Sequence, residues 1–141
     1  MSIRKRQTGS FLLEALIAIL IFSMGILAIV GLQAASIKAS GDAKYRSDAN
    51  MLANQLIGQI WVSDRTAATL QAAYQTGGTA YTAWQADVEG SLPGAAENPP
   101  TVAVNLVAGG SVTSSLVTIT IFWKAPSEST VHQYNVVTQI I

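Results

Sequence analysis

The sequence predicts an α+β protein in which one long N-terminal helix packs on a small antiparallel β-sheet. Three observations support this class. An apolar run lies near the start of the chain, an amphipathic helical pattern follows without a proline between residues 10 and 65, and three strand-like runs fill residues 101–141. A helix with one apolar face must bury it against another layer, and the predicted sheet supplies that layer.

Composition excludes several kinds of chemistry. The 141 residues suit one domain with a modest core, and the absence of cysteine excludes disulfides, Cys-based metal sites and Cys nucleophiles. Of eight Lys/Arg, three form the cluster Arg4, Lys5 and Arg6; without them, five remain against eight Asp/Glu, a formal charge of −3. That balance leaves no basic surface for nucleic acid.

The apolar run extends over residues 10–32 and predicts a transmembrane or assembly helix. At ~1.5 Å per residue it makes a helix of about 34 Å, which exceeds the roughly 30 Å hydrocarbon core of a bilayer. The basic cluster before it predicts a cytoplasmic N-terminus and an exported remainder.

Glu14 is the only charged residue in this run. The run is open to three interpretations: a cleaved secretory signal, a permanent signal anchor, or a helix cut ahead of its apolar part. A carboxylate at the centre of a membrane helix costs roughly 2.5 kcal/mol or more, which a plain signal or anchor has no reason to bear. Glu14 at the headgroup boundary would instead snorkel to water. Small residues at 33–36 give only a weak secretory cleavage site.

The motif Gly9-Ser10-Phe11-Leu12-Leu13-Glu14, after a basic leader and before an apolar helix, resembles the class III signal of type IV prepilins. The resemblance implies that prepilin peptidase removes residues 1–9 by cutting between Gly9 and Ser10, and that Ser10 is N-methylated. Glu14 then becomes the fifth mature residue, where the family has its glutamate. Family members often begin with Phe followed by Thr or Ser, whereas Ser10 and Phe11 stand here in the reverse order.

In a growing filament the methylated amine of Ser10 would lack a counter-ion among apolar helices. Glu14 of the same or a neighbouring subunit can supply one, because low dielectric strengthens the attraction between opposite charges. This hypothesis gives Glu14 a role in assembly rather than in catalysis.

Residues 33–65 are expected to continue the helix with one amphipathic face. Its apolar stripe consists of Tyr45, Ala49, Leu52, Leu56 and Ile60, widened by Ala53 and Ile57. About 55 helical residues would span roughly 80 Å, so the apolar half is expected to protrude and to contact lipid or partner helices. Gly25 and Gly31 suit either close helix packing or local melting of that half.

Residues 66–100 form a connecting region rich in turn signals, with one short helix expected from Tyr81 to Gly90. Its grouping of Trp84, Asp87, Val88 and Leu92-Pro93-Gly94 resembles the segment that joins helix to sheet in PilV-type minor pilins.

Three strands are expected at residues 101–107, 112–124 and 131–141, as an antiparallel meander. Alternating apolar residues give the second strand one face that can pack on the helical stripe, and the third strand has the same period. These residues are Val117, Ile119, Ile121 and Trp123 in the second strand and Tyr134, Val136 and Ile140 in the third. The arrangement is the one expected of a pilin-like fold.

Nothing in the sequence predicts an enzyme, a cofactor or a metal site. His132 is the single histidine and is expected to have a surface or sheet-facing role. The carboxylates Asp87, Glu89 and Glu97 are best explained as solvated loop charges. Gly77-Gly78 and the glycine pair at 109–110 lack the lysine or third glycine of nucleotide-binding loops.

Three functions remain open. The first is a minor pilin of the PilV type that helps to initiate or cap type IV pilus assembly. Its partners would be other minor pilins, the major pilin, prepilin peptidase/N-methyltransferase, the inner-membrane assembly platform and, before assembly, the lipid bilayer. The second is a minor pseudopilin of a type II secretion system, of the GspI type. The third is a signal-anchored periplasmic adhesion or binding module. Residues 47–61 and 118–123, with the Leu92-Pro93-Gly94 turn, look more like PilV.

Overall fold

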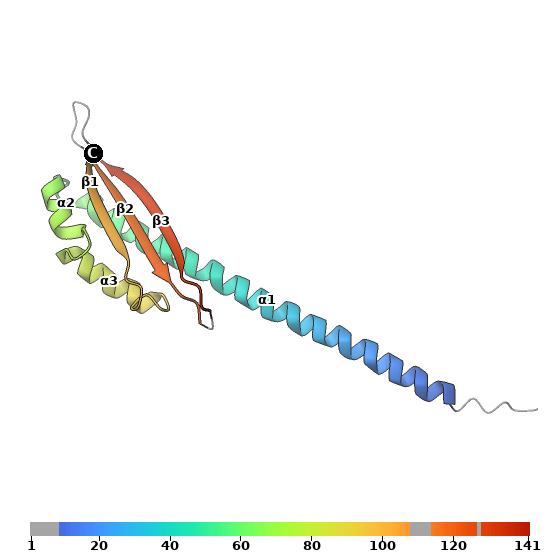
Figure 1. The fold of residues 1–141 in the computed structure, drawn as a ribbon. Helices are drawn as coiled ribbons and strands as arrows, with labels where there is room; N and C mark the ends of the chain where they lie inside the picture. Colours follow the sequence, from blue (N-terminus) through green and yellow to red (C-terminus); the bar gives the residue numbers. More distant parts are fainter. Residues whose placement is uncertain (1–8, 108–113, 127) are drawn as a thin grey trace, which may run out of the picture. The chain divides into compact units, whose positions relative to one another are not determined.

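The structure is a computed structural model, and it describes residues 9–107, 114–126 and 128–141. The described residues form α1, α2, α3, β1, β2 and β3 in chain order (Figure 1). The chain divides into two compact units, Met1–Ser40 and Gly41–Ile141. The predicted α+β class is confirmed, because a long N-terminal helix is followed by a small three-stranded antiparallel sheet.

Helix α1 runs from Gly9 to Val62 and contains 54 residues without a proline. It ends three residues before the expected boundary at residue 65. The backbone amide and the hydroxyl of Ser63 both donate to the Ile60 carbonyl, at 3.3 and 2.9 Å. Asp64 then accepts the Thr66 amide at 3.0 Å. Side-chain hydrogen bonds of this kind offer the backbone an alternative to the next helical turn.

Two helices, rather than the one expected, occupy the connecting region. Helix α3, Thr79–Ser91, confirms the helix predicted from Tyr81 to Gly90. Helix α2, Ala67–Tyr74, was not predicted. The glycine pair between them is required by the backbone: Gly77 has a φ of +89°, and a Cβ on Gly78 would overlap the Ala73 carbonyl.

The turn after α3 is fixed by a close approach to the sheet. Gly94 has a φ of +70°, and a Cβ there would lie 2.8 Å from the Cβ of Lys124. The Lys124 amide donates to the Pro93 carbonyl at 2.8 Å. The Leu92-Pro93-Gly94 motif therefore ties the end of α3 to the end of β2.

The sheet is the predicted meander. Strands β1 (Thr101–Val107), β2 (Ser114–Trp123) and β3 (His132–Ile140) pair antiparallel in the order β1-β2-β3. Residues 112 and 113, expected in the second strand, lie outside the described residues, and the third strand is one residue shorter at each end than expected.

One hydrophobic core holds the second unit together. Of the predicted helical stripe, Ala49, Leu52, Ala53, Leu56 and Ile60 are buried, and Tyr45 and Ile57 are half-buried against the core. The inner face of β2 is buried at alternate positions. Tyr134 and Val136 of β3 pack against this core and Ile140 belongs to it. The helix-on-sheet packing predicted for this half of the chain is therefore confirmed.

Candidate processing and assembly site on the N-terminal helix

The predicted site residues lie on the first turns of α1. Gly9 is the first helical residue, and residues 1–8 of the predicted leader lie outside the described residues. Ser10 and Glu14 are both exposed and line one shallow depression together with Leu13 and Ile17. Residues four apart share one face of a helix, with Cβ atoms about 5–6 Å apart. A free amine at Ser10 would therefore lie one helical turn from the Glu14 carboxylate.

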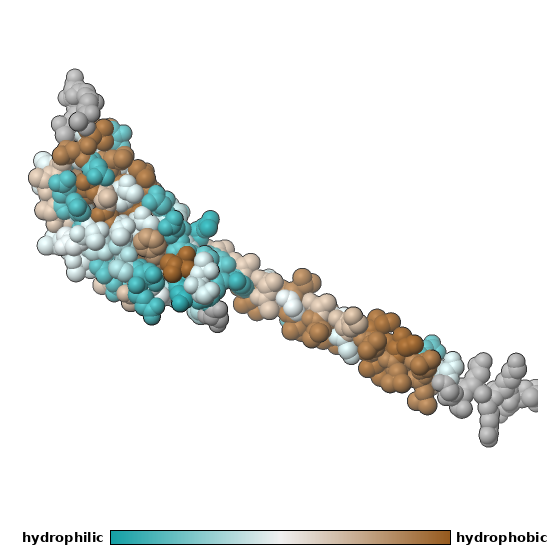
Figure 2. All heavy atoms as spheres, viewed as in Figure 1, coloured by the Kyte–Doolittle hydropathy of each residue, from teal (hydrophilic) through white to brown (hydrophobic). Residues whose placement is uncertain are grey.

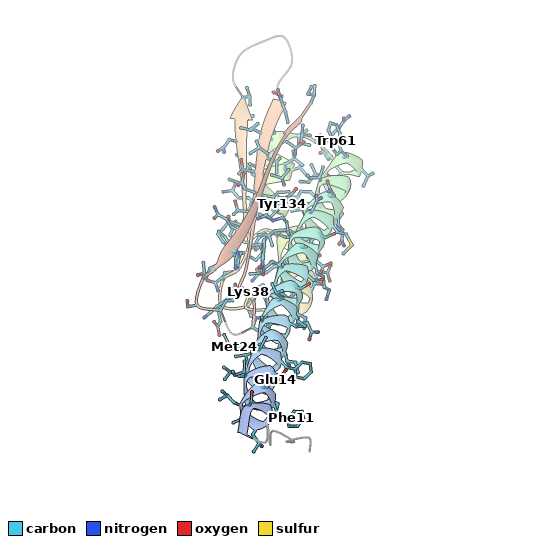
Figure 3. All side chains as sticks on the ribbon, turned by 90° about the vertical axis from the view of Figure 1, so that its right-hand side faces the viewer. Phe11, Glu14, Met24, Lys38, Trp61 and Tyr134 are labelled. Atoms are coloured by element: carbon cyan, nitrogen blue, oxygen red, sulfur yellow. The ribbon has the colours of Figure 1, made fainter. Side chains whose placement is uncertain are left out.

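Apolar residues make up most of the visible N-terminal part of α1, on which Figure 3 labels Glu14 (Figures 2 and 3). In the described part of the first unit every side chain is exposed except that of Ala15, which is half-buried. Phe11, the labelled neighbour of Glu14 in Figure 3, is 73% exposed. An exposed apolar surface of this extent is typical of a helix that contacts lipid or other proteins.

One helix in the described part of the chain is long and apolar enough, by length and composition, to cross a membrane. It is α1, and none of its most apolar window is buried within the chain. The Ser23 hydroxyl within it donates to the Ile19 carbonyl at 2.7 Å. This polar group is therefore satisfied inside the helix and imposes little cost in hydrocarbon.

Gly25 and Gly31 have open space around them. A Cβ at either position would meet no atom within 4 Å beyond the helix's own backbone. Contacts within the described chain therefore do not require these glycines. Both interpretations from the sequence, packing against partner helices and local melting, stay open.

Asp87, Glu89 and Glu97, for which the sequence predicts no catalytic or metal-binding role, do not cluster with His132. The expectation of solvated loop charges holds for Glu97 but is wrong for the other two, because Asp87 and Glu89 lie on α3. Asp87 is exposed, whereas Glu89 is half-buried and accepts a hydrogen bond from the Gln85 amide at 2.6 Å. Among the described residues, His132 instead lies with Glu128 and Asp42. The four-residue spacing of Glu128 and His132 was visible in the sequence, but Asp42 is brought to them only by the fold.

Comparison with protein-family models, with curated proteins and with solved structures finds no match. Fold and site together define a coarse class: an α+β protein whose N-terminal helix is able, by length and composition, to anchor it in a membrane.

Proposed function

We propose that this chain is a minor pilin of a type IV pilus, of the PilV type, that takes part in initiating or capping pilus assembly. Glu14 carries the proposal: it is the only charged residue from Ser10 to Ile37, and it lies one helical turn from Ser10 on the exposed apolar part of α1. A membrane anchor alone does not call for a carboxylate at this position.

The chemistry of assembly gives that carboxylate a use. Cleavage between Gly9 and Ser10 creates a positively charged amine at the edge of an apolar helix. In a bundle of such helices the amine is removed from water, and a carboxylate nearby offsets part of that desolvation. In this proposal Glu14 of the same or an adjacent subunit supplies that carboxylate and so favours transfer of the helix from lipid into the polymer.

The proposed location follows from the charges that flank the helix. Arg4, Lys5 and Arg6 precede it, which favours a cytoplasmic N-terminus and a periplasmic second unit in the inner membrane before incorporation into the pilus. The partners of this proposal are other minor pilins, the major pilin, prepilin peptidase/N-methyltransferase, the assembly platform and the bilayer.

Two rivals have distinct signatures. A minor pseudopilin of a type II secretion system would share cleavage and Glu14 but assemble with secretion-system subunits. A signal-anchored periplasmic module would keep residues 1–9 and assemble with neither.

The test combines processing with incorporation. Intact mass should show a chain that starts at Ser10 and carries one methyl group, whereas Gly9→Ala should retain residues 1–9. The Glu14→Ala variant should still be cut and membrane-bound. Its amount in sheared pili should fall at least tenfold, because the Ser10 amine would then be a buried charge without a partner. Glu97→Ala, which removes an exposed carboxylate of the second unit, is the matched control and should enter pili normally.

An unprocessed wild-type chain, or normal incorporation of Glu14→Ala, contradicts the proposal. Since the chain has no cysteine, Leu20→Cys provides a single cross-linking position on the exposed helix. Cross-links to pilins support the pilus, and cross-links to pseudopilins support the first rival. An uncut chain without either cross-link supports the second.

A further inference from the structure

Three side chains with metal-binding atoms meet in the second unit. Asp42 lies on α1, Glu128 lies in the connection between β2 and β3, and His132 is the first residue of β3. One potential ligand atom from each lies within 4.8 Å of the other two. All three residues are half-buried, which distinguishes them from fully solvated surface charges.

We propose that Asp42, Glu128 and His132 bind one divalent transition-metal ion, for which Zn²⁺ fits best. Zinc accepts imidazole nitrogen together with carboxylate oxygen, and three protein ligands with one water complete a tetrahedral site. Mg²⁺ and Ca²⁺ prefer sets made of oxygen alone, so the histidine disfavours them. The proposal concerns the second unit and holds whether or not the chain joins a pilus.

The distances are compatible with a bound ion. Ligand atoms about 2.1 Å from a tetrahedral ion lie roughly 3.4 Å from one another. The Glu128 Oε2 and His132 Nε2 atoms are 2.6 Å apart, the separation of a short hydrogen bond. Replacing this hydrogen bond with two bonds to a metal ion would open the pair by about 0.8 Å. The most distant pair, at no more than 4.8 Å, would close by at most about 1.4 Å.

The histidine is held in place by a buried ring. His132 stacks on Trp123 with centroids 5.8 Å apart and an interplanar angle of 16°. Trp123 is itself only 2% exposed, so its ring is fixed by the core. A ligand whose orientation is set before binding loses less conformational entropy when it coordinates a metal.

A cavity beside the group provides space for the remaining coordination. It measures about 380 Å³ and is lined by Asp42, Ala43, Arg46, Trp123 and His132, which is enough for several water molecules. Arg46 is its positively charged lining residue, and its charge opposes a cation nearby. Neutralising Arg46 should therefore strengthen metal binding, which a purely structural Glu128–His132 pair would not predict.

The direct test uses the single histidine of the chain. The full-length protein, purified in mild detergent without a histidine tag and stripped with EDTA, is labelled with ¹⁵N-histidine. Only one imidazole is then observed, and ZnCl₂ should move its Nε2 resonance to saturation at one equivalent. MgCl₂ at the same concentration should leave it unchanged, and titration calorimetry should give a stoichiometry of one for Zn²⁺.

Variants connect the signal to the site. Asp42→Asn and His132→Gln should weaken Zn²⁺ binding at least tenfold, while Glu97→Gln should bind as the wild type does. Arg46→Gln should tighten binding roughly threefold to tenfold, through the removal of one nearby positive charge. If circular dichroism shows that the Asp42→Asn variant does not fold, the Glu128→Gln variant is used for the same test and should weaken Zn²⁺ binding likewise.

The outcomes that overturn the proposal are specific. They are an Nε2 resonance that ZnCl₂ leaves in place, or Zn²⁺ binding that Asp42→Asn does not weaken. Either result makes the Glu128–His132 contact a structural link that closes the β2–β3 connection and nothing more.

Discussion

The two most buried tryptophans of the second unit differ in one hydrogen bond. Trp84 of α3 is 1% exposed, and its indole N–H donates to the Leu52 carbonyl of α1 at 2.9 Å. Trp123 of β2 is 2% exposed, and its indole N–H has no acceptor among the described residues. An unsatisfied buried donor costs about 1–3 kcal/mol, so Trp123 contributes to stability through its packing and its stacking on His132 rather than through a hydrogen bond.

This difference predicts unequal costs for the same substitution. Trp84→Phe and Trp123→Phe remove the same atoms from equally buried positions, but only Trp84→Phe loses a satisfied hydrogen bond. Trp84→Phe should therefore lower the free energy of unfolding by about 1 kcal/mol more than Trp123→Phe does. Urea unfolding with EDTA present measures both, without any contribution from metal. A Trp123→Phe variant that is equally or more destabilised would contradict the assignment.

At the scale of elements, hydrogen bonds from single side chains fasten the short helices to the sheet. Tyr81 of α3 donates its hydroxyl to the Pro100 carbonyl, just before β1, at 2.6 Å. Thr76 and Gln71 cover the outer edge of β1, where they donate to the carbonyls of Val102 and Val104. Because an uncovered edge invites pairing with another chain, α2 and the turn after it protect this side of the sheet.

Tyr81 makes the attachment of α3 sensitive to alkaline pH. Burial, and secondarily the negative charge of Glu89, raise the pKa of Tyr81 above its ordinary value of 10.0. Its contribution to stability is fully present below pH 10, because both folded and unfolded chains then keep the proton. Above pH 10 the unfolded chain loses the proton first, so the contribution falls until the pH passes the folded-state pKa.

The measurement compares the wild type with Tyr81→Phe. Near pH 7 the wild type should be more stable by about 1 kcal/mol, the usual value of one such hydrogen bond. This difference in the free energy of unfolding should shrink between pH 10 and pH 11. A difference that stays constant or grows over that range would show that the phenol is not held in its neutral form.

Periodic burial made most elements predictable, whereas a short helix stabilised by tertiary contacts was not predictable. The stripe from Ala49 to Ile60 and the alternation along β2 appear directly in the sequence, because burial on one face dictates where apolar residues recur. Helix α2 was missed, since its eight residues hold only two buried side chains, Leu70 and Tyr74. This helix is too short to show a clear hydrophobic period in the sequence. It is stabilised mainly by contacts with β1 and α3, which exist only in the folded chain.

The candidate site on α1 was predictable for a different reason. Gly9, Ser10 and Glu14 are close in sequence, so a regular helix is enough to place Ser10 and Glu14 on one face. The group of Asp42, Glu128 and His132 joins residues from three elements or connections. Glu128 and His132 are close in sequence, but no local pattern indicates that Asp42 joins them, because Asp42 meets them only after the sheet has packed on the helix.

At the scale of the whole molecule, the two units differ in the burial of their apolar side chains. Every member of the core cluster lies between Ala49 and Ile140, within the second unit. The described residues of the first unit contribute none and expose their apolar side chains. The second unit therefore contains the interactions that stabilise it, while the described part of the first unit has no core of its own.

This division predicts that a chain starting at Ser40 folds on its own and needs no detergent. Ser40 supplies a favourable N-cap for the remaining part of α1, and Asp42 in the first turn interacts favourably with the helix dipole. The truncated protein should elute as a monomer in gel filtration and unfold cooperatively, as followed by circular dichroism.

Leu56→Ala in the same chain should lower its free energy of unfolding by about 2–5 kcal/mol, because Leu56 is fully buried in the core. In the full chain, Leu20→Ala should leave that free energy unchanged, since the Leu20 side chain is 62% exposed. Aggregation of the truncated chain, or a gradual loss of structure on heating, would mean that the second unit also requires the apolar part of α1.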